Sequence, residues 1–227
     1  MVRDGYYYGF SLILASALIR GVTDSWLWSA LPLLPAAFFL WFFRNPRRVI
    51  PQEPGLVVSP ADGKVTEIVN ITTLDGKGIR ISIFLSVFDV HVNRSPVSGL
   101  LKSVRYQPGK YLNAMNSASA EQNEQCVAVM ETEDGQLITF KVIAGLLARR
   151  IVFHPRRGQL LGRGELVGMI KFGSRCDLLL PAGADLQIKL GDRVRGGTSI
   201  LARLSPPTEG KFASAPCCLR CEASDRT

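Results

Sequence analysis

Three short segments of the chain contain residue types that could carry covalent chemistry. The first contains Asp62 in a Pro-Ala-Asp-Gly sequence, the second contains His91 at the end of an apolar run, and the third is the pair Gly173-Ser174. A carboxylate, an imidazole and a hydroxyl are groups that proteins use for general acid–base and nucleophilic catalysis. Taken one at a time, each segment also fits an ordinary turn or strand end. Only the three together point to a reaction.

The sequence gives little support for a metal site, and we expect none. The only histidines are His91 and His154, so a zinc site would need unusual ligands. Five cysteines in 227 residues are too sparse for a disulfide scaffold. The tail holds a Cys-x-x-Cys pair but no second pair at metal spacing. Its cysteines are Cys217, Cys218 and Cys221.

The middle of the chain has the pattern of a mainly β fold. Short apolar runs alternate with turn residues, without the strand–helix alternation of a doubly wound fold. The pair Asp134-Gly135 predicts a β-hairpin, and residues 111–125 predict a helix or a loop. The expected strands include Leu56–Val58, Val65–Val69, Ile79–Val90, Val127–Met130 and Leu137–Ile143.

Two glycine-rich units indicate the kind of β domain. Residues 158–164 and 191–197 each contain a glycine turn, a short apolar step and a second glycine turn. Such units form tight corners in barrel-sandwich domains of the biotinyl or lipoyl kind. Neither unit is followed by Lys-Ser or Lys-Thr, which argues against a nucleotide phosphate loop. We therefore expect a mainly β (α+β) domain that resembles a barrel-sandwich.

The N-terminus predicts a hydrophobic helical membrane segment over residues 1–43. An apolar run from Tyr6 to Ile19 is followed by a second, from Trp26 to Phe43, without a charged residue. The second run is close to the length that spans a bilayer and the first is short for it. We expect either a short hairpin with both ends inside or a wedge in one leaflet. The arginines that follow favour a cytoplasmic position for the next domain, at the cell membrane. They are Arg44, Arg47 and Arg48.

The net charge of +8 is unevenly distributed along the chain. Basic and acidic residues cancel within residues 1–43 and again within the tail, residues 205–227, so the excess lies in residues 44–204. A basic domain beside a membrane favours anionic lipid surfaces and anionic substrates, whereas this charge is too small to indicate a nucleic-acid partner. We expect a membrane segment, a catalytic β domain over 44–204, and a flexible tail.

Several stretches, in the same order along the chain, resemble the phosphatidylserine decarboxylase family, in its short form that includes the archaetidylserine enzymes. The resemblance covers about residues 3–204. Several long, ordered matches are far more specific than any one of them. The strongest stretches are Phe43–Pro46, Val58–Val65, Phe84–Arg94, Ala144–Ile151 and Phe172–Arg175.

The resemblance implies a proenzyme that cuts its own chain between Gly173 and Ser174. The β chain, residues 1–173, and the α chain, residues 174–227, would remain associated, and Ser174 would become a pyruvoyl group, the implied cofactor. A pyruvoyl ketone accepts the electrons that decarboxylation releases. The implied reaction converts the anionic lipid phosphatidylserine to phosphatidylethanolamine and CO2 in phospholipid biosynthesis. Diacyl and ether lipids remain open as substrates, as does a homo-oligomer.

The resemblance also implies roles for single residues. Longer family members use an Asp-His-Ser arrangement for self-cleavage, and Asp62 matches its Asp. Where they have two histidines three positions apart, this chain has His91 and then Arg94. His91 is therefore expected to activate Ser174, to protonate the substrate, or both, and His154 to be a solvated loop residue. Arginines can bind a phosphate or carboxylate in a bidentate way. Those expected to contact substrate are Arg149, Arg150 and Arg175.

A second interpretation is a membrane-anchored carrier or binding module of the biotinyl or lipoyl type. Lys171 precedes the Gly-Ser turn, but Ile170 and Phe172 replace the neighbours usual for an acylated lysine. A third interpretation is a structural membrane protein whose basic domain only binds lipid. Both leave the three segments described first without a role, so the decarboxylase interpretation is preferred.

Overall fold

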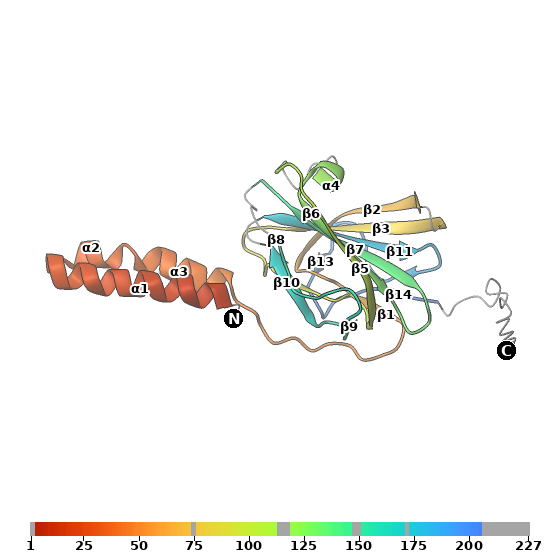
Figure 1. Ribbon diagram of the computed structural model, residues 1–227, viewed down its shortest axis with the longest axis horizontal. Coiled ribbons are helices and arrows are strands. Elements are labelled where there is room, and N and C mark those ends of the chain that lie inside the picture. The colour runs from red at the N-terminus through yellow and green to blue at the C-terminus, as the bar shows by residue number, and fades with distance from the viewer. Residues whose placement is uncertain (1–2, 74–75, 113–118, 147–150, 171–172, 206–227) are drawn as a thin grey trace, which may run out of the picture.

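The computed structural model describes residues 3–73, 76–112, 119–146, 151–170 and 173–205. A helical hairpin projects from one end of a β-rich body (Figure 1). The helices are α1 (Arg3–Thr23), α2 (Trp26–Ala30), α3 (Leu33–Phe42) and α4 (Ser119–Gln122). The strands are β1 (Leu56–Val58), β2 (Gly63–Thr73), β3 (Gly76–Leu85), β4 (Val92–Arg94), β5 (Gly99–Gln107), β6 (Gln125–Glu131), β7 (Leu137–Ala144), β8 (Ile151–Phe153), β9 (Leu160–Leu161), β10 (Leu166–Ile170), β11 (Ser174–Pro181), β12 (Asp185–Leu186), β13 (Arg193–Val194) and β14 (Ile200–Arg203).

Close packing of α1 against α3 forms the hairpin. A Cβ added to Gly9 would lie 2.4 Å from the Leu40 side chain, so a larger residue would push the helices apart. Ser16 Oγ donates a hydrogen bond to the Ser29 carbonyl at 2.5 Å, which ties α1 to α2. The two apolar runs, residues 6–19 and 26–43, lie in α1 and, for the most part, in α2 with α3, so the prediction that they are helical is confirmed. None of the described helices is both long and apolar enough to cross a membrane.

The hairpin exposes apolar side chains over much of its surface. A helix on a soluble domain usually buries one apolar stripe and turns a polar face to water. Here large apolar residues point outward from all three helices. The exposed ones are Tyr6, Tyr7, Tyr8, Phe10, Ile13, Leu14, Leu18, Val22, Trp26, Leu27, Trp28, Leu31, Leu33, Leu34, Phe38 and Trp41.

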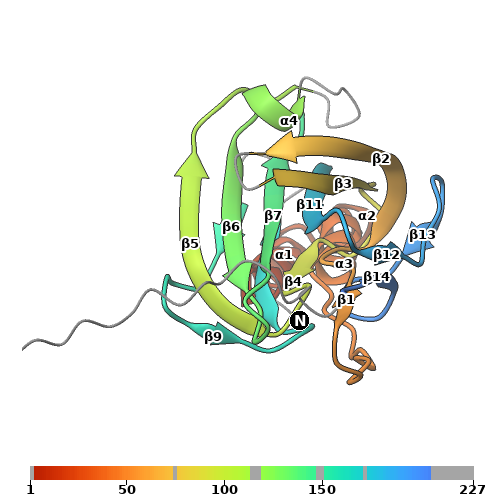
Figure 2. The same cartoon turned by 90° about the vertical axis from the view of Figure 1, so that its right-hand side faces the viewer.

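One eight-stranded sheet and two three-stranded sheets form the body. The large sheet has the order β13-β2-β3-β11-β7-β6-β5-β9 and curls into a half-barrel (Figure 2). The small sheets have the orders β1-β14-β12 and β4-β10-β8. Buried residues from all three sheets form one core, among them Val57, Phe140 and Ile170. The prediction of a mainly β body is confirmed.

Most predicted strands are present, but one prediction was wrong at its end. The run Ile79–Val90 was expected to be one strand, whereas β3 ends at Leu85. The Asp89 carboxylate accepts hydrogen bonds from the Ser86 N–H (2.8 Å) and hydroxyl (2.7 Å), which closes a turn directly after the strand.

Two further predictions, a hairpin and a helix or loop, concern the chain between β5 and β7. The hairpin at Asp134-Gly135 is confirmed: it joins β6 to β7, and Gly135 has φ 74°. Within the stretch 111–125, residues 119–122 form α4, and residues 113–118 lie outside the described residues.

The two glycine-rich units fold alike. Each has a glycine at positive φ, a two-residue strand, and a second glycine at positive φ, a region that favours glycine. The first unit comprises Gly158 (86°), β9 and Gly164 (73°); the second comprises Gly191 (93°), β13 and Gly197 (77°). Because β9 and β13 are the edge strands of the large sheet, the repeat forms a corner at each edge.

Candidate active site

Ser174 is the first residue of β11, a strand in the middle of the large sheet. It is paired with Leu85 of β3 on one side and with Ala144 of β7 on the other. Its side chain is buried, and its Oγ has no hydrogen-bond partner among the described residues. Gly173 has φ 43°, a left-handed conformation that favours glycine, and a Cβ there would meet nothing within 4 Å. The Gly173-Ser174 bond therefore joins an uncrowded turn to a rigid strand.

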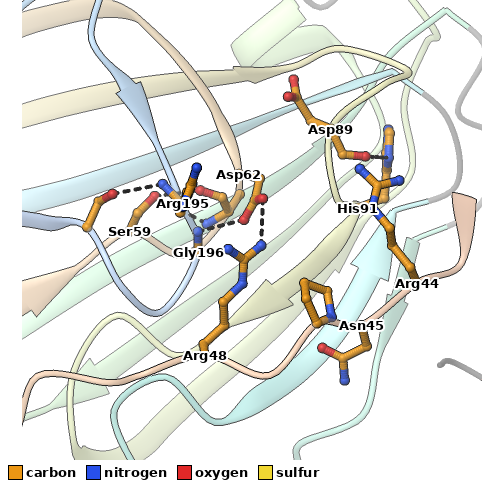
Figure 3. A network of polar contacts seen from close by, with 12 residues as sticks. Arg44, Asn45, Arg48, Ser59, Asp62, Asp89, His91, Arg195 and Gly196 are labelled. Carbon is orange, nitrogen blue, oxygen red and sulfur yellow. Dashed lines mark hydrogen bonds and ion pairs between the residues drawn. The ribbon is translucent and has the colours of Figure 1, made fainter. Parts of the chain in front are cut away.

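His91 is buried beside the base of the hairpin. Its ring centroid lies 4.4 Å from that of Phe42. Its Nδ1 lies 3.0 Å from the Asp89 carbonyl oxygen, as Figure 3 shows. Since a carbonyl only accepts, Nδ1 is the donor, and a neutral ring then carries its lone pair on Nε2. That Nε2 is buried and has no partner in the described part of the chain.

The surroundings of His91 favour its neutral form. Burial lowers the pKa of His91 from its ordinary value of 6.5 to about 4. The hydrogen bond to the Asp89 carbonyl and the charge of Asp89 act in the opposite direction, and the charge of Arg44 lowers the pKa further. At neutral pH the Nε2 atom is therefore an unoccupied base.

Main-chain contacts bring the segments of His91 and Ser174 together. Leu85 lies opposite Ser174 in the sheet, and the N–H of Ile170 donates to the carbonyl of His91 at 3.1 Å. The segment 85–91 is thus joined at one end to Ser174 and at the other to Ile170. Each segment contains a buried polar atom without a partner in the described part of the chain, Nε2 of His91 and Oγ of Ser174, and no described hydrogen bond links the two.

Asp62 lies in a second polar group, separate from His91 in Figure 3. One carboxylate oxygen accepts from Arg48 Nη2 at 2.7 Å, and the other accepts from the Gly196 N–H at 2.7 Å. Among the described residues no hydrogen bond joins Asp62 to His91 or Ser174. As it stands, this carboxylate fastens the linker after the hairpin to the glycine corner at β13.

The glycine after Asp62 is required by the sheet. A Cβ on Gly63 would lie 2.2 Å from the Phe84 carbonyl oxygen, a contact that no side chain tolerates. The main chain of β2 therefore lies so close to that of β3 at Gly63 that a larger residue has no space. The Asp-Gly pair read as turn chemistry in the sequence is also a packing requirement.

Arg175 points away from Ser174, because successive strand residues face opposite sides of a sheet. Its Nε donates to Asp177 at 2.6 Å, and its Nη2 donates to Glu67 at 2.8 Å and to the Ser82 hydroxyl at 2.7 Å. Burial alone would lower the Arg175 pKa, but the two carboxylates raise it above its ordinary value. The Arg175 guanidinium is thus buried and paired with protein groups, whereas the sequence predicted that it contacts the substrate.

Other predicted site residues fall in different places. His154 is exposed, in the loop position expected for it. The two remaining arginines, the carrier lysine and the tail cysteines lie outside the described residues. These are Arg149, Arg150, Lys171, Cys217, Cys218 and Cys221.

The structure adds two residues that sequence reasoning left without a role. Arg94 donates to the Gly164 carbonyl at 2.9 Å and to Asn45 Oδ1 at 2.6 Å, so it holds the linker against the β9–β10 turn. Asn93 is buried, and neither its amide nitrogen nor its amide oxygen has a partner within the described ranges. Both lie in the stretch that contains His91, but spacing alone does not reveal which of its polar residues are buried.

Comparison with known proteins assigns this chain to a family. The family model described as phosphatidylserine decarboxylase matches residues 36–202. The chain belongs to the phosphatidylserine decarboxylase family. Its match includes Asp62, His91 and Ser174, whereas α1 and α2 precede it.

Relatives in the phosphatidylserine decarboxylase family cover most of the chain. Three of them are named phosphatidylserine decarboxylase proenzyme. The chain is 46% identical over 205 residues to the protein of Amoebophilus asiaticus (87% of this chain, 91% of the relative). It is 40% identical over 208 residues to that of Desulfotalea psychrophila (90% and 96%) and 44% identical over 195 residues to that of Rhodopirellula baltica (82% and 81%).

Proposed function

We propose that this protein is a self-processing decarboxylase that converts phosphatidylserine to phosphatidylethanolamine and CO2. One observation carries the proposal: Ser174, at the predicted cleavage bond, has a buried Oγ without a partner, directly after a left-handed Gly173. Burial of a hydroxyl without a hydrogen bond destabilises the fold and is uncommon, so such a group calls for an explanation, for example a catalytic role. Membership of the phosphatidylserine decarboxylase family and the proenzyme names of the relatives give that role its chemistry.

Self-cleavage would begin when Ser174 Oγ attacks the carbonyl carbon of Gly173. The new C–O bond forms as the C–N bond to Ser174 breaks, which leaves an ester and a free amine. Elimination of the ester and addition of one water then release the Gly173 carboxylate and ammonia, and the former Ser174 becomes a pyruvoyl group. His91 Nε2, neutral and unoccupied, is the base that would take the hydroxyl proton.

The residues at this bond fit a pyruvoyl group. The Ser174 side chain is enclosed, and a Cβ at Gly173 would meet nothing within 4 Å, so the described residues leave space beside the bond that would be cut. Once formed, the pyruvoyl group supplies a ketone that binds the substrate amine and accepts electrons as CO2 leaves. His91 would then hold the proton that returns to the substrate carbon. Its proposed use in cleavage and in turnover draws on the same Nε2 atom.

The two chains made by cleavage would stay together because the sheet interleaves them. β11 of the α chain lies between β3 and β7 of the β chain. β13 pairs with β2, and β14 pairs with β1, so these two pairings also join the α chain to the β chain. Separation would require the large sheet to come apart.

The membrane location is also a proposal. The hairpin exposes aromatic and aliphatic residues over much of its surface, and such a surface favours an apolar phase. Arginines follow it directly, which favours a cytoplasmic body at the cell membrane. Residues 1–43 would hold the body, residues 44–204, at the bilayer where the anionic substrate lies. Arg149 and Arg150 remain proposed contacts of the substrate head group, and a carrier function is not favoured.

Intact mass spectrometry of the purified chain tests the function directly. We expect two chains divided after Gly173, and an α chain whose N-terminal group reacts with hydroxylamine, a carbonyl reagent. Ser174→Ala should give one uncut chain and no release of CO2 from phosphatidylserine. A wild-type chain that stays whole after long incubation, with an unmodified Ser174, would refute the proposal.

A further inference from the structure

The turn between β3 and β4 carries an exposed aromatic side chain beside the base of the hairpin. Phe88 is 74% exposed. Its ring centroid lies 6.3 Å from that of Trp41, edge to face, and Trp41 is the penultimate residue of α3. The apolar surface of the hairpin therefore continues onto the body through one aromatic pair.

Contacts from both sides hold this turn in place. The Arg44 guanidinium lies 4.0 Å from the centre of the Trp41 ring. It donates to the carbonyl of Trp41 at 3.0 Å and to that of Phe88 at 2.9 Å. On the other side, Asp89 closes the turn through two hydrogen bonds from Ser86. Phe88 thus projects from a fixed turn that is fastened to the end of α3.

Exposed cations lie on the Asp89 side of the turn. Arg193 Nη1 lies 3.3 Å from Asp89 Oδ1 while the Arg193 side chain is 74% exposed. Lys64, opposite Arg193 in the β2–β13 pairing, is exposed. An aromatic tip with cations beside it is complementary to the interface of an anionic bilayer, where aromatic rings lie at head-group depth and cations meet lipid phosphates.

We propose that the turn Ser86–Asp89, with Phe88 at its tip, is a second membrane contact that docks on the surface of an anionic phospholipid bilayer. The inference rests on the proposed function and extends it. The hairpin alone would leave the body free to tilt about its base, whereas a second point of contact limits that tilt. Since His91 follows Phe88 by three residues, docking of the turn would orient the His91 region toward the lipid head groups.

A pair of matched substitutions tests this contact in the full chain. Phe88→Ser removes the exposed ring, and Leu160→Ser is the control because Leu160 is 76% exposed on edge strand β9. Binding is measured by flotation with phosphatidylcholine vesicles that contain phosphatidylserine. We expect Phe88→Ser to weaken binding by about tenfold, as for partial loss of one buried aromatic ring. Leu160→Ser should leave binding unchanged.

A second arm separates charge from apolar contact. Arg193→Glu should weaken binding to vesicles with phosphatidylserine and have little effect on vesicles of phosphatidylcholine alone. The control Arg105→Glu, an exposed position on β5, should bind both kinds of vesicle as the wild type does. Decarboxylation by Phe88→Ser should fall further on vesicles than on a soluble short-chain phosphatidylserine.

The outcomes distinguish this inference from the proposed function. A wild-type chain that is neither cut nor active would refute the proposed function. A cut, active enzyme in which Phe88→Ser and Leu160→Ser bind vesicles alike would refute only the docking turn. Loss of a dimer in Phe88→Ser, with vesicle binding intact, would likewise overturn it and assign the ring to contact with a second copy.

Discussion

The N–H of Ile170 donates to the carbonyl of His91 at 3.1 Å, which joins the main chain at the proposed base to the last residue of β10. With the pairing of Leu85 and Ser174, it joins the segment 85–91 to β10 and β11, the strands on either side of the cleavage bond in the sequence. The main chain therefore positions the proposed base and nucleophile without a described hydrogen bond between their side chains. A site built in this way leaves both atoms free to act.

The two histidines should behave differently when each is removed. His91→Ala should slow self-cleavage by at least about 100-fold, the usual contribution of a general base. His154→Ala is the matched control, because His154 is exposed in a loop, and it should be cut at the wild-type rate. Band intensities on denaturing gels over time measure both. Normal cleavage of His91→Ala would remove His91 from the cleavage site.

The low pKa of His91 predicts an unusual pH dependence. A base must be neutral to act, so cleavage should persist as pH falls through 6.5 and decline only as pH approaches about 4. A rapid-mixing pH series with freshly refolded proenzyme checks this rate. A decline centred near pH 6.5 would show that His91 is not the base or is not buried.

The same shift affects stability. Below pH 6.5 the unfolded chain binds a proton at His91 and the folded chain does not, so stability falls as pH falls from 6.5 to about 4. The full difference is about 3 kcal/mol by linkage. Urea unfolding of uncut Ser174→Ala should show this loss, and the loss should be smaller when His91→Gln is added.

Asp62 is predicted to act through the linker that it holds. Both of its carboxylate oxygens are occupied, by Arg48 and by the Gly196 N–H. If it works by position, Arg48→Gln should slow self-cleavage about as much as Asp62→Asn does. Stability should fall by about 1–3 kcal/mol in each, because a partner is left without its charged hydrogen bond. A large effect of Asp62→Asn with none from Arg48→Gln would assign Asp62 to the chemistry itself.

The sequence predicted best the features that depend on neighbouring residues. Hairpin and corner glycines follow from the positive φ that each turn needs, so Gly135, Gly158 and Gly191 could be read directly. The predicted helices also formed, but the uncharged run 26–43 is divided between α2 and α3 at Pro32, which caps α3. The number of consecutive apolar residues does not reveal this break between α2 and α3.

Two of the three features missed depend on contacts distant in sequence, and the third depends on a local turn. The partner of Asp62 at Gly196 is 134 positions away, and no local pattern signals it. The run through Phe88 was read as strand because its side chains are apolar, whereas capping of Ser86 by Asp89 ends β3 and exposes the ring. From the sequence, Arg175 is a candidate ligand for a phosphate, but in the structure its guanidinium forms ion pairs with Glu67 and Asp177.

Arg175 should be important for stability more than for substrate affinity. Its guanidinium is buried with Asp177, and removing one partner of a buried pair costs about 3–5 kcal/mol. Arg175→Met should therefore lower the free energy of unfolding by about that amount, and adding Asp177→Leu should restore part of it. Urea titration of uncut Ser174→Ala as the background measures both. If Arg175→Met instead raised KM for phosphatidylserine with normal stability, Arg175 would contact substrate.

Association of the two chains can be tested by the concentration dependence of unfolding. β11 pairs with β3 over eight residues and with β7 over six, so the cut protein should elute as one species in native buffer and separate only in denaturant. Unfolding of the cut protein releases two chains from one complex, so by mass action its midpoint should rise with protein concentration. Uncut Ser174→Ala has the same strands in one chain, and its midpoint should not depend on concentration. Chains that part on dilution in native buffer would show that the interleaved sheet does not hold the enzyme together.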